Sequence, residues 1–171
     1  MIIRHVDGED LRKVMRVVPA QVVIVTARFR GRSRGITINS FNSVSLSPPL
    51  ISFNVHLDAF MYPIVSQASH YAVHILDESN AAFSAHFARP ELDGEEQFRS
   101  VAHTIDKNGI PLIMSVGQIL QCRSTTIHTA GDHAILVGEV VGVIGNHDQD
   151  PLIYYDGAYY SLGQLAYESA Q

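Results

Sequence analysis

Neutral hydrogen-bonding side chains are concentrated between residues 35 and 50, in the stretch GITINSFNSVSLSPPL. The stretch carries Ser, Thr and Asn side chains but no Lys, Arg, Asp or Glu, and the apolar segment LISFNV follows it. A solvated loop normally carries charge, so these groups point to recognition of an uncharged polar ligand. The alternative is a turn-rich loop in which Ser and Asn side chains bond to nearby backbone.

Nine histidines raise the question of a metal site. His70 and His74 lie in a predicted strand, where residues four apart are separated by about 13 Å, too far to share one ion. His128 and His133 flank a predicted turn, but no HExxH or Cys/His spacing accompanies them. We therefore predict no metal site and interpret the histidines as solvated or hydrogen-bonded.

Side-chain catalysis finds equally little support in the sequence. No GxSxG motif marks a nucleophile, and Glu95 and Glu96 lie in the most polar stretch, where we expect them to be solvated. The GxGxxG and Walker A patterns are also absent. What remains is a protein that supplies a neutral polar cradle while a cofactor supplies the reaction. The donor and acceptor edge of an isoalloxazine ring, beside its apolar faces, matches such a cradle.

Hydrophobic periodicity predicts a helix over residues 7–18, capped by Asp7 and ended by Pro19. We expect 31–35 to be a turn, Ser79 to cap a helix, and 88–110 to form a polar surface excursion. TAGDH and YDG have the chemistry of hairpin turns. The remaining segments with strand or short-helix character are 21–29, 35–40, 50–55, 59–67, 70–76, 117–128, 133–145, LIYY and AYY.

Long β-branched strands joined by hairpins favour an antiparallel barrel with short helices over a parallel sheet. With 171 residues, 46% hydrophobic and 17% charged, the chain is expected to form one domain over 1–171. Its net charge of −5 and the lack of a basic stripe argue against nucleic acid or a membrane as partner. The single Cys122, interpreted as a buried structural thiol, and the absence of an apolar leader predict a cytoplasmic protein.

Five segments together resemble the flavin reductase-like family, the small reductase components of two-component flavin-dependent monooxygenases. They follow the family's order along almost the whole chain: VMRVVPAQVVIVTA, GITINSFNSVSLSPPLISFNV, HYAVHILDESNAAFSAHFA, LQCRSTTIHTAGDHAILVGEVVGV and DPLIYYDGAYY. The resemblance implies an FMN-binding split β-barrel, a homodimer with flavin near the subunit interface, and hydride transfer from NADH or NADPH to FMN or FAD. Reduced flavin would then leave for a separate oxygenase.

The resemblance also implies roles for individual residues. His133, in the Gly-Asp-His turn, would lie beside the flavin where the nicotinamide stacks; the alternative is a turn histidine bonded to Asp132 or to backbone. Pro48, with Pro49, would shape the turn behind the ring. The residues that would contact the flavin are Thr37, Asn39, Ser40, Ser43, Val44, Ser45 and Pro49, together with Phe87, Ala88 and Arg89, which would lie along its phosphate or adenosine end.

One segment departs from the family pattern. After the strand that ends in NV, many members carry a basic residue and then hydroxyls that hold the flavin phosphate, whereas this chain has HLDAFMY, with no Lys, Arg, Ser or Thr. A phosphate would lose a charge-assisted partner there, and Arg89, Arg34 or Arg32 are the candidates to replace it.

The sequence thus predicts an NAD(P)H-dependent flavin reductase. The departure favours an alternative from a different class, a split-barrel protein that holds FMN or passes electrons to a partner without efficient turnover of free flavin. A barrel that binds a ligand other than flavin is a third, less favoured possibility.

Overall fold

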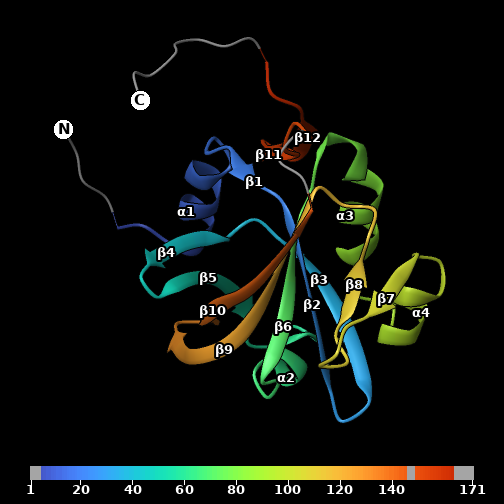
Figure 1. The fold of residues 1–171 in the computed structure, drawn as a ribbon. Helices are drawn as coiled ribbons and strands as arrows, with labels where there is room; N and C mark the ends of the chain where they lie inside the picture. Colours follow the sequence, from blue (N-terminus) through green and yellow to red (C-terminus); the bar gives the residue numbers. More distant parts are fainter. Residues whose placement is uncertain (1–4, 146–148, 164–171) are drawn as a thin grey trace.

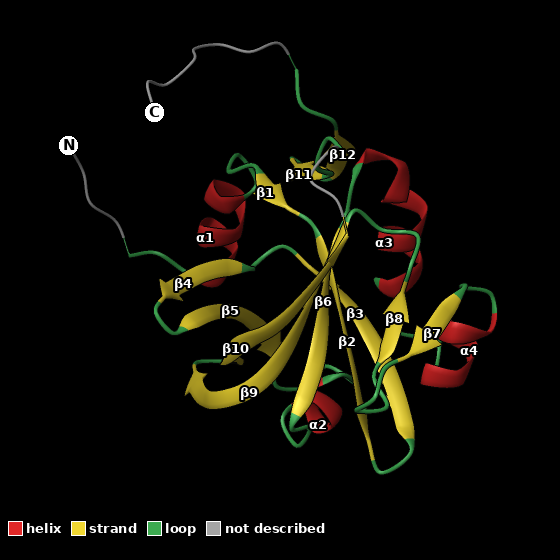
Figure 2. Cartoon of the chain, viewed as in Figure 1, coloured by secondary structure: helices red, strands yellow, loops and turns green. Residues whose placement is uncertain are grey.

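Most of the chain forms antiparallel strands with short helices at their ends (Figures 1 and 2). The computed structural model describes residues 5–145 and 149–163. The elements in chain order are α1 (Gly8–Met15), β1 (Ala20–Gln21), β2 (Val23–Phe29), β3 (Arg32–Ile38), β4 (Asn42–Leu46), β5 (Pro49–His56), α2 (Tyr62–Val65), β6 (His70–Ile75), the 3-10 turn η1 (Glu78–Asn80), α3 (Ala81–Phe87), α4 (Gly94–Arg99), β7 (His103–Ile105), β8 (Pro111–Ile113), β9 (Gln118–Ala130), β10 (His133–Gly145), β11 (Ile153–Tyr155) and β12 (Ala158–Tyr160).

Seven strands form the main sheet, in the order β3-β2-β6-β9-β10-β5-β4, with every neighbouring pair antiparallel. Two smaller sheets, β1-β11-β12 and β7-β8, lie beside it. The predicted mainly-β antiparallel architecture with short helices is confirmed. Within the described residues β3 and β4 are the free edges of the sheet, so its hydrogen bonds do not close a barrel.

β2 is buried on both faces and separates two apolar layers. Val23 and Val25 face the main core of the curved sheet, together with Phe53 and Leu136. Ile24 points the other way because strand side chains alternate between faces. It packs in a second cluster, which Val22, Leu76, Phe87, Phe98, Val101, Ile113 and Leu152 complete. α3 is therefore held against the sheet by a core of its own.

The long β9–β10 hairpin sets the register that matters for the site. Its turn contains Gly131 at φ 62°, as the TAGDH motif predicts, and pairs Ala130 with His133. β10 also pairs with β5, in a register that places His133 opposite His56. The YDG turn is confirmed in the same way, with positive φ at Asp156 and Gly157.

The structure differs from the sequence predictions at one turn and at one helix cap. Residues 31–35 were expected to be a turn, but Arg32–Ile38 is strand β3, and the turn is confined to Arg30 and Gly31, both with positive φ. Ser79 was expected to cap the helix that is α3, but Ser79 lies within η1, whose cap is Asp77, and Asn80 is the N-cap of α3; Asp77 accepts the Ser79 backbone N–H. Both errors arose because pairing with β2, and an acidic cap two residues earlier, outweigh the local Gly and Ser signals.

The expected surface excursion over residues 88–110 was wrong in part. It contains α4 and β7, and Gln97 and Phe98 are buried. The Gln97 amide accepts the Gly35 N–H and donates to the Gly35 carbonyl, so it satisfies the backbone of the edge strand β3. α1 does form, with Asp7 as its N-cap, but none of its residues is buried.

Candidate functional site

Thr37 and Asn39, at the end of β3, line a cavity of about 210 Å³ beneath the end of α3. Ala88 closes one side of it, and Tyr154 and Tyr159 from the β11–β12 hairpin close another. The structure therefore brings together two of the predicted ring-contacting residues, Thr37 and Asn39, with Ala88, which is predicted for the far end of the flavin. The two tyrosines were missed, since only their place in the folded hairpin brings them to the cavity.

Hydrogen bonds fix the wall of this cavity. The Thr37 hydroxyl donates to the Ser84 carbonyl at 2.7 Å, and the Ser84 hydroxyl donates to the Tyr159 hydroxyl oxygen at 2.7 Å. The Thr37 proton is thus used within the protein, and its oxygen lone pairs remain for a ligand. The Tyr159 hydroxyl, in contrast, keeps its own proton to donate. This wall supplies neutral acceptors and donors, as the sequence predicts.

A second cavity, of about 170 Å³, lies on the other side of Ala88. It is lined by Phe87, Ala88 and Arg89, the three residues predicted for the far end of the flavin. Phe87 is 2% exposed, and a Cβ on Gly35 would lie 2.5 Å from its ring, so glycine is what allows the ring to pack on β3. Arg89 is paired with Glu91, its Nε 2.7 Å from Oε1.

Most of the remaining lining of the second cavity comes from β3 and from the segment after β5 that departs from the family pattern, and Pro90 and Gln97 complete it. Its other members are Arg34, Gly35, Ile36, Asp58, Ala59, Phe60, Met61, Pro90 and Gln97. β3 therefore contributes to both cavities, and Ala88 separates them.

Residues 40–49 occupy the other edge of the sheet and line neither cavity. The Ser40 hydroxyl bonds to both the N–H and the carbonyl of Asn54. The Ser45 hydroxyl accepts the Ser47 N–H. These are the local side-chain to backbone bonds of the alternative interpretation. Ser43, Val44 and Pro49 are exposed along this edge, and their predicted flavin contacts stay predictions.

His133 is the first residue of β10, and its side chain is 45% exposed. Its Nδ1 lies 2.6 Å from Asp132 Oδ1. This is the bond predicted by the alternative interpretation, in which His133 is a turn histidine bonded to Asp132. This bond lowers the pKa of Asp132, so the carboxyl stays ionised. With Nδ1–H directed at Asp132, the Nε2 of neutral His133 is left as an acceptor.

His56 joins this cluster because β5 and β10 pair in register. Its ring meets that of His133 edge to face, with centroids 5.1 Å apart, and its Nε2 is 3.8 Å from Asp132 Oδ2. The Asp58 N–H donates to His56 Nδ1, so neutral His56 carries its proton on Nε2 and directs it toward Asp132. The Leu57 N–H, bonded to the Asp132 carbonyl at 2.9 Å, ties the two turns together.

His56 was not predicted as a site residue, although the register of two adjacent strands would have found it. His128, the other histidine expected near His133, lies opposite Ile135 on β9, and the predicted approach of the two histidines has no contact to support it. No group of three or more His, Cys, Asp or Glu able to hold a metal ion occurs in residues 5–145 and 149–163.

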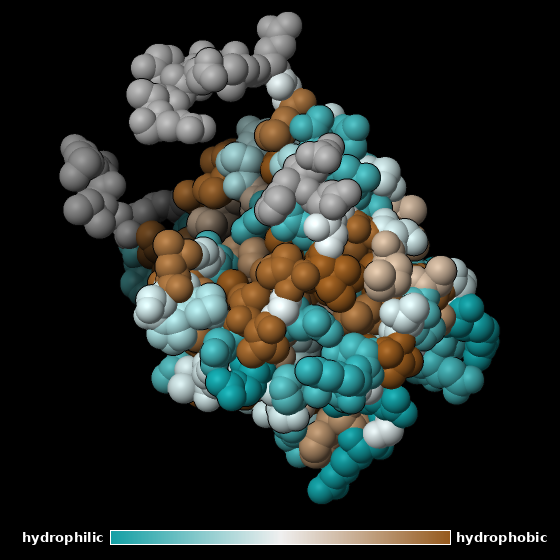
Figure 3. Space-filling view, in the orientation of Figure 1, coloured by the Kyte–Doolittle hydropathy of each residue, from teal (hydrophilic) through white to brown (hydrophobic). Residues whose placement is uncertain are grey.

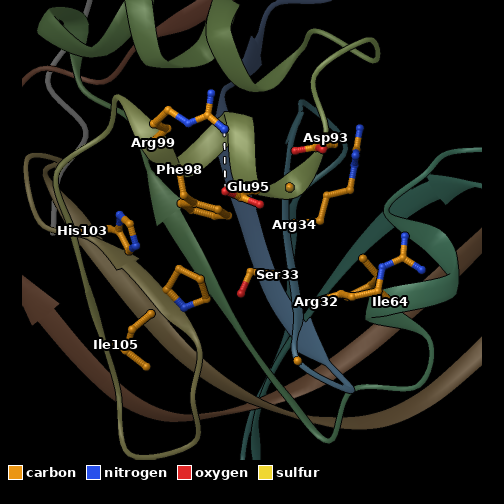
Figure 4. Close-up of a pocket in the computed structure, with 13 residues that line it drawn as sticks. Arg32, Ser33, Arg34, Ile64, Asp93, Glu95, Phe98, Arg99, His103 and Ile105 are labelled. Atoms are coloured by element: carbon orange, nitrogen blue, oxygen red, sulfur yellow. Dashed lines mark ion pairs between the residues drawn. The ribbon is translucent and has the colours of Figure 1, made fainter.

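A third cavity, of about 690 Å³, is an open groove between the start of β3, α4 and β7 (Figure 4). Phe98 and His103 form an aromatic wall with ring centroids 5.0 Å apart, and Arg99 is paired with Glu95 at 3.6 Å. Of the predicted flavin contacts, none lines it. Its charged groups are of both signs, so it does not select a ligand class.

Comparisons with known proteins identify the family to which the fold and sequence belong. Residues 15–163 match the model of the flavin reductase like domain. The chain is 33% identical over 153 residues to FMN reductase (NADH) SmoA of Agrobacterium fabrum, covering 90% of this chain and 85% of that protein. It is 31% identical over 159 residues to the reductase component of 4-hydroxyphenylacetate 3-monooxygenase of Thermus thermophilus, covering 90% and 96%.

Among solved structures, the Streptomyces globisporus C-1027 NADH:FAD oxidoreductase SgcE6 with NAD and FAD fragments superposes with a TM-score of 0.86. Its sequence is 31% identical, and the match covers 96% of this chain and 99% of that one. Fold, domain match and sequence similarity agree along almost the whole length. The chain belongs to the flavin reductase-like family.

Proposed function

We propose that this chain is an NAD(P)H:flavin oxidoreductase that reduces FMN or FAD with NADH or NADPH and supplies the product to a separate monooxygenase. The observation that carries the proposal is the β5–β10 register. It brings His133, Asp132 and His56 together at the start of residues 56–61, and the far end of that turn lines the cavity beneath Ala88. The turn at residues 56–61 thus connects the predicted hydride-transfer residue, His133, with the cavity predicted for the far end of the flavin.

The residues present fit a flavin. Thr37, Asn39 and Tyr159 offer uncharged acceptors and donors for the polar edge of the ring, and Tyr154 adds an apolar face. None of these groups fixes a charge beside the ring, which suits a group that gains charge on reduction. These side chains are therefore the uncharged hydrogen-bond donors and acceptors that a neutral binding site for a cofactor requires.

A flavin held by Thr37, Asn39 and Tyr159 would supply the acceptor for a hydride from the nicotinamide nucleotide. The contribution of the protein is to stack the two rings within reach, and no side-chain acid is required for that step. His133 Nε2 is an acceptor when the ring is neutral and a donor when it is protonated, so it can orient the nicotinamide or offset developing charge. Asp132 fixes the tautomer that leaves Nε2 available.

Kinetics with purified protein test the proposal. NADH and NADPH oxidation is followed with FMN, FAD or riboflavin as acceptor, and we expect turnover with at least one pair. His133→Ala should lower kcat/KM by about tenfold or more, a loss of ~1.4 kcal/mol of transition-state stabilisation, with flavin affinity unchanged. His128→Ala, in the same hairpin, is the matched control. No turnover with either nucleotide would refute the reductase assignment.

One observation favours the alternative, a flavin-binding protein without efficient turnover of free flavin. The two cavities hold only about 210 and 170 Å³ within a single chain, below the range of roughly 300–1,000 Å³ that is usual for ligand sites. A protein that copurifies with flavin and fails to oxidise either nucleotide would establish this second function.

We also propose a homodimer in which a second copy completes the site and the split barrel. α1 has no buried residue, and Leu11, Val14 and Met15 are each more than half exposed. Leu46 on β4 is 89% exposed, and apolar side chains also gather over β10 at the centre of Figure 3. A surface of this kind is unusual on a monomer. Light scattering should report a dimer that Val14→Glu dissociates; a monomeric wild type would contradict the proposal.

The whole chain is proposed to act as one domain in the cytoplasm. Among the residues that the structure describes, no helix has the length and apolar character needed to span a bilayer. The composition adds no sign of a nucleic-acid partner, since the net charge is −5.

A further inference from the structure

Arg34 is the one buried arginine among the described residues, only 9% exposed. It lies on β3 and lines the 170 Å³ cavity with Phe60, Ala88 and Arg89. Burial lowers the pKa of its guanidinium, and nearby Asp93 offsets only part of that effect. An arginine remains charged even so, because its ordinary pKa is far above neutrality. The cavity therefore has a cation in its wall.

The guanidinium has unused hydrogen-bonding capacity. Its Nη2 donates to the Pro90 carbonyl at 3.2 Å, and its Cζ lies 5.1 Å from the centroid of the Phe60 ring. In the described part of the chain no carboxylate comes within 4.0 Å of it. A guanidinium has five N–H donors, and a buried charge without a partner is costly. An anion in the cavity would satisfy both needs.

The other arginines near the site are either in an ion pair or line a different cavity. Arg89 lines the same cavity, but its Nε is paired with Glu91. Arg34 also borders the 690 Å³ groove, whereas Arg32 lines only that groove and not this cavity, and the two side chains stand apart in Figure 4. Among these candidates Arg34 alone combines burial, a cavity and free donors.

The HLDAFMY segment, which lacks a phosphate-binding cation of its own, contains the aromatic ring that contacts Arg34. HLDAFMY contains no Lys, Arg, Ser or Thr, yet it places Phe60 against the Arg34 guanidinium. A guanidinium that makes a cation–π contact with an aromatic ring keeps its charge and can still recognise a phosphate. The departure in the segment and the position of Arg34 are therefore parts of one arrangement.

We propose that Arg34, held against Phe60, is the phosphate subsite of this chain and binds the phosphate of the flavin nucleotide. The proposal rests on the proposed function, since that function makes a flavin nucleotide the ligand. The same chemistry could serve the diphosphate of the nicotinamide nucleotide, and the experiment separates these two sources.

The test compares the binding of FMN and of riboflavin to the wild-type protein and to the Arg34→Gln variant. Binding is measured by quenching of flavin fluorescence, in the absence of nicotinamide nucleotide. Arg34→Gln should weaken FMN binding by about tenfold or more and riboflavin binding by less than about twofold. Arg34→Lys should fall between, because it keeps the charge and loses the fork. Arg32→Gln, two residues earlier on the same strand, is the matched control and should leave the ratio of the two affinities unchanged.

An unchanged ratio of FMN to riboflavin affinity in Arg34→Gln would overturn the proposal, as would a rise confined to the KM for NADH. If Arg34→Gln does not fold, competition on the wild-type protein decides: inorganic pyrophosphate should displace FMN and leave riboflavin bound, and failure to do so counts against the subsite. Because binding is measured without turnover, an inactive protein with a changed ratio would refute the reductase proposal and support the subsite.

Discussion

Lowering the pH from neutrality should destabilise this protein through one buried histidine, His74. Its Nδ1 lies 3.1 Å from the Ile24 carbonyl, and its Nε2 accepts the Ile113 N–H at 3.0 Å. The ring is fully buried, and burial lowers its pKa from 6.5 to about 4. Protonation would place a second N–H against the Ile113 N–H, so the neutral form joins β2, β6 and β8.

The direction and size of the change in unfolding free energy follow from the linkage between proton binding and folding. The folded pKa lies below the unfolded one, so the stabilising contribution is complete above pH 6.5 and is lost as the pH falls toward 4. The shift of about 2.5 units corresponds to at most ~3.4 kcal/mol, at ~1.36 kcal/mol per unit. Between about pH 7 and about pH 5 the loss of unfolding free energy should be ~2 kcal/mol.

Urea unfolding across this pH range measures the effect, with His74→Gln compared with the wild type. The amide of Gln can keep a donor and an acceptor but does not titrate, so the variant should lose ~2 kcal/mol less over the same interval. Carboxylates that protonate in the range do so in both proteins and cancel. His70→Gln, on the same strand but partly exposed, should keep the wild-type dependence. An undiminished pH dependence in His74→Gln would refute the reasoning.

Two further predictions concern other buried groups. Burial raises the pKa of the Cys122 thiol to about 12, so a thiol reagent at mildly alkaline pH should modify the folded protein only as fast as it unfolds; fast labelling without unfolding would contradict the burial. The Tyr71 hydroxyl has no hydrogen-bond partner among the described residues and occupies the space of a Cβ on Gly138. Tyr71→Phe should therefore leave thermal stability unchanged or raise it by up to ~1 kcal/mol, and a loss larger than that would reveal an overlooked partner.

Much of the fold was predictable because its signals are local. A β-branched run predicted β2, and glycine-containing turns predicted the β9–β10 and β11–β12 hairpins. What failed depended on contacts between distant segments. Gln97 reads as part of a polar surface stretch, yet it is buried because its amide pairs with both backbone groups of Gly35. No local pattern announces that bond.

The candidate site was likewise predictable only in part from the sequence. Family motifs located Thr37, Asn39 and Ala88, which the fold brings to one cavity. Tyr159 reaches that cavity only through a hairpin formed near the far end of the chain, and His56 reaches His133 only through strand register. Residue type alone does not distinguish them from other tyrosines and histidines, so sequence reasoning passed over both.

The segment after β5 shows how a local departure can be compensated across the fold. As sequence, HLDAFMY is a phosphate loop without its cation. In the structure its first residue, His56, shares Asp132 with His133, and its fifth, Phe60, supports the guanidinium of Arg34. The bond from the Leu57 N–H to the Asp132 carbonyl holds the turn against the hairpin between these two contacts. One short turn therefore supports both the proposed hydride-transfer end and the proposed phosphate end, so replacing Phe60 should disturb phosphate binding before it disturbs His133.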